Sequence, residues 1–206
     1  MAETDDWRRD AELLQRWRAG DNQAGGELYD RHSPSVFRLF QNKVPDQTEE
    51  LMQQTFLALV EGRDKIREGT SVRAFVLQVA RFKLIDHLRG LSRGRAFDAE
   101  LHSVAELAPG PSTIFAQRRE HQLLVQGLRR IPVEHQLALE LFYWEGLKAN
   151  EIAAVFGVSH SAMRSRLSKA RGLLEAAIAE CAASPEERDS TTMGLDTWAA
   201  QIRARM

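Results

Sequence analysis

Residues 146–174 constrain the fold more than any other part of the chain, because their pattern predicts two helices in close succession. In the first half, Ile152, Val155 and Phe156 recur at i, i+3 and i+4, the spacing that places side chains on one face of an amphipathic helix. This spacing predicts a helix over residues 148–156. The second half is also helical in its periodicity, but it is mainly polar and basic.

The junction between these two helices has the residues of a tight turn. Glycine readily adopts the positive φ that commonly ends a helix, and Gly157 directly follows the first predicted helix. Serine is a good N-cap, because its hydroxyl accepts a hydrogen bond from a backbone N–H of the next helix, and Ser159 stands at that position. The sequence therefore predicts a helix-turn-helix whose second helix begins at His160.

The predicted second helix has one apolar and one polar face. Its inward positions, at i, i+4, i+7 and i+11, are Met163, Leu167, Ala170 and Leu174. The opposite face carries small polar residues and cations, namely Ser161, Arg164, Ser165, Ser168 and Arg171, with Arg166 and Lys169 at its flanks. Such a face suits the DNA major groove, where arginine pairs with guanine or contacts phosphate. A solvated pair of helices in any α-helical domain is the alternative interpretation.

Length and composition frame these predictions. The chain has 206 residues, enough for two small domains or one larger one, and its 43% hydrophobic and 28% charged content is typical of a globular protein. There is no apolar run of transmembrane length and residues 1–20 do not resemble a signal peptide, so we expect a cytoplasmic protein. One cysteine, Cys181, and six scattered histidines offer no metal-ligand spacing, so we expect neither a metal nor another cofactor.

The charge is unevenly distributed along the chain, although the formal net charge is only −1. Acidic residues crowd both ends, and the basic residues gather in the second helix of the helix-turn-helix and in one further cluster, Arg81, Lys83, Arg89, Arg93 and Arg95. Two basic patches suggest two contacts with one polyanion, because local rather than net charge decides phosphate binding. Each patch alone is equally typical of a solvated surface.

Helical periodicity extends over most of the remaining chain, and no stretch alternates as a strand would. Upstream, the apolar positions that define it are Leu28, Tyr29, Val36, Phe37, Leu39, Phe40, Leu51, Phe56, Leu59, Val60, Phe75, Val76, Val79, Ala80, Leu84 and Leu88. The pattern fails between residues 92 and 112, where glycine, proline and acidic residues predict a flexible linker. We therefore predict an all-α protein of two helical domains, with boundaries at residues 1–94, 95–116 for the linker, 117–181, and 182–206 for a polar tail.

Two sets of short motifs occur in the two predicted domains. The first set comprises Gln53-Gln54-Thr55-Phe56, Val72-Arg73-Ala74-Phe75, Ala80-Arg81-Phe82 and Asp86-His87-Leu88-Arg89. The second comprises Ile131-Pro132, Gly146-Leu147 with Glu151-Ile152-Ala153, and Ser165-Arg166-Leu167 with Ala170-Arg171. With these motifs, residues 24–94 and 117–178 resemble, in the family's order, the extracytoplasmic-function sigma factors, a compact group of the sigma-70 family that directs bacterial RNA polymerase to promoters.

The resemblance implies two functions for the first domain, binding to core polymerase and recognition of promoter DNA. Contacts with the polymerase clamp would fall on Glu49, Glu50, Gln53, Gln54 and Phe56. Recognition and melting of the promoter's minus-10 element would fall on Arg73, Arg81, Phe82, Lys83 and Arg89. No covalent chemistry is needed, because binding energy opens the strands and unstacked bases need only a pocket or an aromatic surface.

The resemblance implies recognition of the minus-35 element for the second domain. The contacts would fall on His160, Ser161, Arg164, Ser165, Arg166, Ser168, Lys169 and Arg171. The implied partners are promoter DNA, core RNA polymerase at its clamp and flap regions, and an anti-sigma factor, with no small-molecule substrate and no membrane span. The acidic linker could mimic nucleic acid in the polymerase's RNA exit path, or be a solvated spacer.

Some residues depart from the family pattern. Gln47 and Gln54 replace acids, which makes the clamp-binding helix less negative, and Phe75 replaces a tryptophan, a change that core packing explains. Phe82 stands where the family commonly has asparagine. A phenylalanine can stack on a base but cannot hydrogen-bond to it, so we expect weak or unusual base discrimination there, unless Phe82 is a core aromatic.

Two competing functions and one segment remain open. A dimeric DNA-binding regulator would use the helix-turn-helix alone, but it leaves the motifs of residues 24–94 without a purpose. An enzyme is disfavoured, because neighbouring pairs such as Asp86 and His87 point about 100° apart on a helix and no nucleophile, phosphate loop or metal set accompanies them. In the tail, Leu195, Trp198 and Ile202 predict a short amphipathic helix that docks on the protein's own domains or on a regulator, or else a frayed end.

Overall fold

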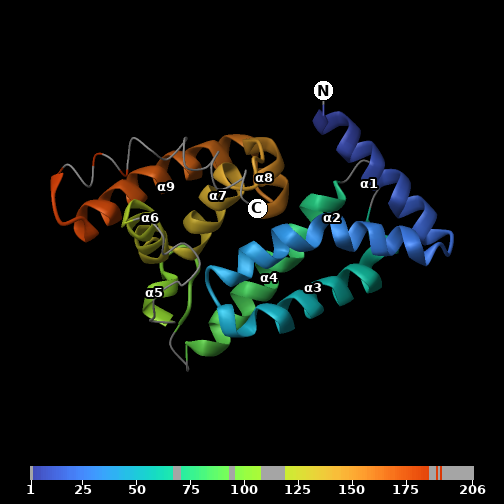
Figure 1. The fold of residues 1–206 in the computed structure, drawn as a ribbon, viewed down its shortest axis with the longest axis horizontal. Helices are drawn as coiled ribbons and strands as arrows, with labels where there is room; N and C mark the ends of the chain where they lie inside the picture. The colour runs from blue at the N-terminus through green and yellow to red at the C-terminus, as the bar shows by residue number, and fades with distance from the viewer. Residues whose placement is uncertain are drawn as a thin grey trace. The chain divides into compact units, whose positions relative to one another are not determined.

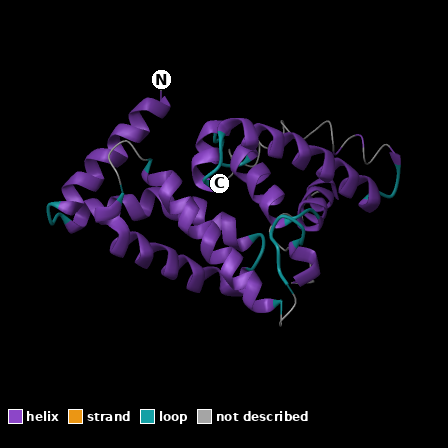
Figure 2. Ribbon diagram, turned by 180° about the vertical axis from the view of Figure 1, so that it is seen from behind, coloured by secondary structure: helices purple, strands orange, loops and turns teal. Residues whose placement is uncertain are grey.

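The computed structural model describes residues 2–66, 71–92, 96–107, 119–185, 189 and 191, and every regular element within them is a helix (Figures 1 and 2). The chain divides into two compact units, Met1–Asp86 and His87–Met206. The predicted all-α fold with two helical domains is thereby confirmed. Because the division between units falls within a helix, the domain boundaries at residues 94, 116 and 181 stay predictions.

The first unit is built around a long central helix. Its elements are α1 (Ala2–Arg18), α2 (Asn22–Gln41), the 3-10 turn η1 (Pro45–Gln47), α3 (Thr48–Gly62), the 3-10 turn η2 (Arg63–Lys65) and α4 (Val72–Leu91), the last of which runs past the division. Helix α2 packs against both α1 and α3. The fully buried apolar side chains of this unit include Leu13, Leu28, Val36, Phe40, Val76 and Leu84.

The packing of α1 on α2 depends on a close approach at Gly25. A Cβ atom at this position would lie 2.6 Å from Nε1 of Trp17, so only glycine fits beneath the indole ring. The start of α2 is fixed by Asp21, whose carboxylate accepts hydrogen bonds from the backbone N–H groups of Gln23 and Ala24 at 3.0 and 3.3 Å. The turn between the two helices is therefore defined by residues that the apolar pattern alone does not reveal.

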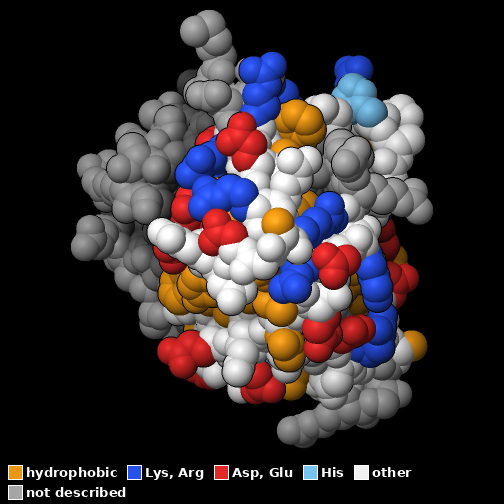
Figure 3. All heavy atoms as spheres, turned by 90° about the vertical axis from the view of Figure 1, so that its right-hand side faces the viewer, with side chains coloured by type: hydrophobic (Ala, Val, Ile, Leu, Met, Phe, Trp, Pro, Cys, Tyr) orange, Lys and Arg blue, Asp and Glu red, His pale blue; other side chains and the backbone are white. Residues whose placement is uncertain are grey.

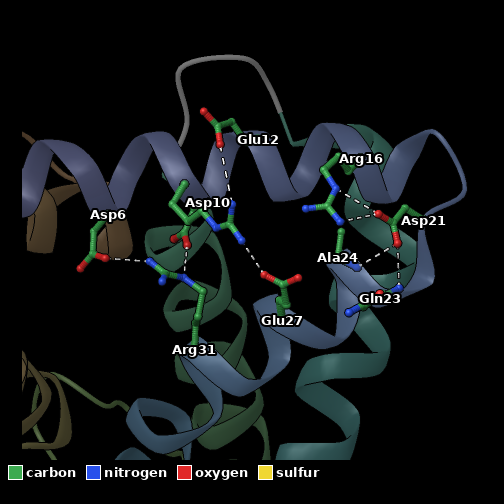
Figure 4. Close-up of polar contacts among 10 residues, drawn as sticks. Asp6, Asp10, Glu12, Arg16, Asp21, Gln23, Ala24, Glu27 and Arg31 are labelled. Atoms are coloured by element: carbon green, nitrogen blue, oxygen red, sulfur yellow. Dashed lines mark hydrogen bonds and ion pairs between the residues drawn. The ribbon is translucent and has the colours of Figure 1, made fainter.

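A buried carboxylate also joins α1 to α2, as Figure 4 shows. Arg31 on α2 donates to Asp10 at 2.7 Å and to Asp6 at 2.8 Å, and Nε2 of His32 lies 2.9 Å from the second oxygen of Asp10. Burial would raise the pKa of Asp10, but the hydrogen bonds and charges of His32 and Arg31 hold that pKa below its usual value. The ionised form of Asp10 is therefore part of the folded first unit.

The second unit consists of helices packed against one long helix. Its elements are α5 (Val104–Leu107), α6 (Arg119–Arg130), α7 (Val133–Tyr143), α8 (Ala149–Phe156) and α9 (His160–Cys181). Helix α9 packs against α6, α7 and α8, and the single turn α5 packs against α6. Helix α7 begins directly after Pro132, which is its N-cap.

The first part of the predicted linker, residues 96–107, is folded onto this second unit. The carbonyls of Ala99 and His102 accept hydrogen bonds from the backbone N–H groups of Glu134 and Val133, both at 3.0 Å. These N–H groups belong to the first turn of α7, where no carbonyl of the helix itself can reach them. Val104 is fully buried. The sequence pattern predicted neither this docking nor α5.

The remaining linker residues 108–116 and the predicted tail helix around Trp198 lie outside the described residues. So do Arg93 and Arg95 of the second basic cluster. Within the described part of the chain, no helix is long and apolar enough to cross a membrane.

Candidate nucleic-acid interface

Helices α8 and α9 form the predicted helix-turn-helix. Helix α8 ends at Gly157, whose φ of 67° and ψ of 31° are left-handed, and Val158 N–H then donates to the Ala153 carbonyl at 3.1 Å. The hydroxyl of Ser159 accepts a hydrogen bond from Ala162 N–H at 3.2 Å, which caps α9. The roles predicted for Gly157 and Ser159, and the start of α9 at His160, are confirmed.

The two faces of α9 also follow the sequence pattern. All four side chains predicted to face inward are buried, namely Met163, Leu167, Ala170 and Leu174. Six of the side chains expected to contact DNA are exposed, namely His160, Ser161, Arg164, Ser165, Ser168 and Lys169. The structure therefore brings hydroxyl groups and cations together on the outer face of α9, which could enter the major groove of DNA.

Arg166 is held within the second unit rather than extended to solvent. Its guanidinium pairs with the carboxylate of Glu100 and lies 3.8 Å from that of Glu134, and its Cζ stands 5.2 Å from the ring centroid of Phe156. The Arg166 side chain is only 18% exposed. Its expected phosphate contact stays a prediction, and these two acidic partners were not foreseen, because they come from distant parts of the sequence.

Arg171 is also engaged by its own chain. Its Nε donates to the Tyr143 hydroxyl at 3.0 Å, and its Cζ lies 5.1 Å from the ring centroid of Phe142 and 5.6 Å from that of Tyr143. The sequence pattern placed Arg171 on the outer face of α9, whereas the structure turns its guanidinium toward α7. The aromatic pair at the end of α7 was the signal that could have indicated this.

A neutral imidazole lies close to the cations of α9. His135 on α7 is 2% exposed, and its Nδ1 has no hydrogen-bond partner among the described residues. Burial lowers the pKa of His135 below its usual value, and the positive charges of Lys169 and Arg166 lower it further. The imidazole therefore favours its uncharged form and adds no cation beside α9.

Helix α4 carries the residues expected at the minus-10 element. Phe82 is 52% exposed, so the alternative of a core aromatic is wrong. The guanidinium of Arg81 lies 5.4 Å from the Phe82 ring centroid, close enough for a cation–π contact. Arg73 and Lys83 are half-buried and Arg89 is exposed. An exposed ring with a cation beside it is a surface on which an unstacked base could lie.

Helix α3 carries the residues expected at the polymerase clamp. Glu49, Glu50 and Gln53 are exposed, and Gln54 donates to Glu50 at 3.1 Å. Phe56 differs from the expectation, because its ring is buried against that of Tyr29, with a centroid separation of 4.5 Å. Phe56 therefore packs below the exposed surface of α3 and is not itself available for a contact with polymerase.

Several of the apolar side chains that define the helical periodicity of α2 and α3 are exposed. Tyr29, Phe37 and Val60 are 45%, 44% and 46% exposed, so the periodicity predicts the helices but does not by itself place these side chains in the core. Leu57 is 56% exposed, and it was not among the residues expected at the polymerase clamp. Its position four residues after Gln53 was the available signal, since i and i+4 share a helix face.

Cations are not gathered on every face of the molecule. The face in Figure 3 intersperses Lys and Arg with Asp and Glu side chains. By contrast, α9 has four cations and no carboxylate between residues 160 and 172. This local excess of positive charge singles out α9 as a surface for a polyanion.

Comparison with known proteins identifies both units. Residues 28–94 match the family described as Sigma-70 region 2, and residues 121–174 match Sigma-70, region 4. The chain is 28% identical over 159 residues to the ECF RNA polymerase sigma factor BldN of Streptomyces coelicolor, covering 75% of this chain and 60% of BldN. This chain therefore spans less than two thirds of the length of that relative.

Two solved structures share the fold. CnrH, solved in complex with the cytosolic domain of CnrY, aligns with a TM-score of 0.64 at 22% identity, over 84% of this chain and 99% of CnrH. The sigma factor RpoE of Bartonella quintana, solved with the anti-sigma factor NepR, aligns with a TM-score of 0.57 at 18% identity, over 75% and 96% of the two chains. With both sigma-70 regions present in order, this chain belongs to the extracytoplasmic-function sigma factors of the sigma-70 family.

Proposed function

We propose that this chain is an alternative sigma factor that binds core RNA polymerase and directs it to promoters with minus-35 and minus-10 elements. The observation that carries the proposal is the presence, on one chain, of a region 2 unit and a region 4 unit whose helix-turn-helix exposes a polar, cationic face. Proteins of this family are DNA-binding regulators. We propose that this one too acts by binding alone, in the cytoplasm, where promoters and polymerase lie.

Recognition of the minus-35 element is assigned to α9. Arg164 and Lys169 are exposed on a helix that a major groove can accept, and Ser161, Ser165 and Ser168 add hydroxyl donors and acceptors beside them. His160 stands at the first position of α9, where the first-turn N–H groups favour a phosphate oxygen. Arg164 is the strongest candidate for a base contact, because it is the exposed arginine of this face.

Minus-10 recognition is assigned to α4. The exposed Phe82 ring offers a stacking surface, and Arg81 lies beside it with a charge that suits the displaced strand. Arg73, Lys83 and Arg89 are the further cations of this helix. A ring that stacks without hydrogen bonding holds any base, so selection at this position is expected to be weak.

Polymerase binding is assigned to the exposed side of α3. Glu49, Glu50 and Gln53 supply polar and negative groups, and Leu57 and Val60 supply exposed apolar area on the same helix. A mixed surface of this kind is typical of a protein interface. We also infer that an anti-sigma factor binds this chain, since RpoE was solved with such a partner.

The test is direct binding to purified bacterial core RNA polymerase, with the chain labelled at its single cysteine, Cys181. We expect saturable binding that Glu50→Lys weakens at least about fivefold, the size of effect that reversing an interfacial charge produces. Glu175→Lys, the same change on an exposed residue of the second unit, is the matched control and should bind as well as the original chain. Binding to duplex DNA without any binding to core would instead favour a free-standing regulator.

A further inference from the structure

Arg166 on α9 is in contact with two carboxylates, although one would balance its charge. Glu134 of α7 is 4% exposed and lies 3.8 Å from the guanidinium, within reach of an ion pair. Glu100 contacts the same guanidinium, but it is 46% exposed and belongs to residues 96–107, outside the helix-turn-helix. The cluster of one cation and two carboxylates therefore carries an excess negative charge at the flank of α9.

Glu100 is bound to a guanidinium that could also bind a DNA phosphate. A guanidinium binds carboxylates and phosphates in the same way, through N–H groups directed at paired oxygens. Arg166 directly follows Ser165 and precedes Lys169 by three residues, and both of these are exposed on the DNA-facing side of α9. A phosphate that approaches this flank would have to compete with the Glu100 carboxylate, which is already bound to Nη2 of Arg166.

The segment that carries Glu100 has a defined position in the second unit. The neighbouring carbonyl of Ala99 accepts a hydrogen bond from Glu134 N–H at 3.0 Å, and that of His102 accepts one from Val133 N–H at 3.0 Å. Two residues after His102, Val104 is fully buried. Glu100 is therefore held beside α9 by backbone contacts on the same segment and does not reach it by chance from a loose tether.

We propose that Glu100 sets the strength of DNA binding by α9, because its carboxylate competes with phosphate for Arg166. The affinity for DNA is lowered while residues 96–107 are packed on the second unit. It rises when the Glu100 carboxylate is removed or no longer contacts Arg166. The inference rests on the proposed function only in taking α9 as the DNA-binding helix. It adds a determinant outside the helix-turn-helix and outside the expected contacts.

The test measures the affinity of the full chain for a 30-base-pair duplex of arbitrary sequence, at several salt concentrations. Arbitrary DNA is sufficient, because a phosphate contact does not depend on base sequence. We expect Glu100→Gln to tighten binding about two- to fivefold, the size of an exposed ion pair, and to steepen the slope of log affinity against log salt by about 0.9, the value of one phosphate. Glu175→Gln, which removes an exposed carboxylate further along α9, should not steepen that slope.

Two further variants distinguish competition between Glu100 and phosphate for Arg166 from a general effect of the negative charge of Glu100 on DNA affinity. Glu100→Asp keeps the charge but shortens the reach to Arg166, so it should also tighten binding, whereas a general effect of charge predicts no change. Arg166→Gln should leave the salt slope of the original chain unchanged, yet lower by about 0.9 the slope of the Glu100→Gln chain. Thermal unfolding followed by circular dichroism checks that each variant is folded. The Glu100 variants are expected to be stable, because Arg166 retains Glu134 when Glu100 is changed.

Unchanged or weaker binding by both Glu100 variants would overturn the inference, as would an Arg166→Gln variant that lowers the slope equally in both backgrounds. Binding of the original chain to core polymerase is measured in parallel. If the chain binds core but Glu100 has no effect on DNA affinity, only this inference fails. If the chain does not bind core, the proposed function fails independently of the result for Glu100.

Discussion

Nε of Arg171 donates a hydrogen bond to the hydroxyl of Tyr143 at 3.0 Å, which ties the middle of α9 to the end of α7. This contact divides the cations of α9 into two groups. Arg166 and Arg171 are bound by groups of their own chain, whereas Arg164 and Lys169 are exposed. The two groups should respond differently to substitution.

Arg171→Ala should lower the stability of the second unit by about 1–2 kcal/mol, because it removes a charged hydrogen bond and a cation–π contact. The salt slope of DNA binding should stay the same. Tyr143→Phe removes only the hydrogen bond and should therefore destabilise less. Urea unfolding and salt-dependent DNA binding measure the two quantities. A reduced slope without loss of stability would mean that Arg171 contacts phosphate after all.

Arg164→Ala should weaken binding to the preferred minus-35 sequence by about 1–3 kcal/mol and relax selection at one base position, as expected for an arginine paired with a base. Lys169→Ala should instead weaken binding to every sequence and lower the salt slope by about 0.9, as expected for a phosphate contact. Binding-site selection from a randomised duplex, followed by affinity measurements, distinguishes the two residues. Equal losses on all sequences for both variants would contradict a base contact by Arg164.

Phe82→Ala should impair opening of the minus-10 element, because stacking of one base on an aromatic ring contributes about 1–3 kcal/mol. Phe82→Tyr retains the stacking surface and should open the promoter normally. Permanganate reactivity of thymines in the minus-10 region measures strand opening by the holoenzyme. Normal opening by Phe82→Ala would show that the exposed ring takes no part in melting.

Asp10→Asn should destabilise the first unit at neutral pH by about 1–3 kcal/mol, because it removes a buried charged acceptor from Arg31 and His32. The pKa of Asp10 is lowered in the folded state from its ordinary value of 3.8, so the folded chain binds fewer protons than the unfolded chain. The stabilisation is therefore complete above about pH 4 and is lost as the pH falls through the lowered pKa.

Chemical denaturation of the original chain and of Asp10→Asn, at several pH values, tests this dependence. The difference in unfolding free energy between the two should be constant near neutrality and should shrink in the acid range. A difference that stays constant down to the lowest pH at which the chain folds would exclude a role for the Asp10 charge.

Sequence patterns predicted the helix-turn-helix well because its determinants are local. Gly157, Ser159 and the four inward positions of α9 act within a few residues of themselves, through backbone conformation, capping and periodicity. The paired state of Arg166 depends on Glu100 and Glu134, which lie 66 and 32 residues earlier in the sequence. No local pattern contains such a pairing.

Exposure was predicted less well than helical structure. In α2 and α3, the apolar positions alone did not distinguish the buried Phe56 from the exposed Tyr29 that it contacts. Which of two neighbouring rings is covered depends on how the helices pack. The docking of residues 96–107 was missed for a similar reason, since it uses backbone carbonyls that any sequence supplies.

The most direct test of the central claim is in vitro transcription with purified bacterial core RNA polymerase and a library of promoter fragments. A promoter-directing sigma factor would give defined transcripts that require this chain, with start sites that reveal a minus-35 and a minus-10 element. Arg164→Ala should reduce these transcripts by weakening recognition of the first element, and Arg81→Ala by impairing opening of the second. Core binding without any chain-dependent transcript, or transcript levels that neither substitution changes, would show that the chain does not direct initiation in this way.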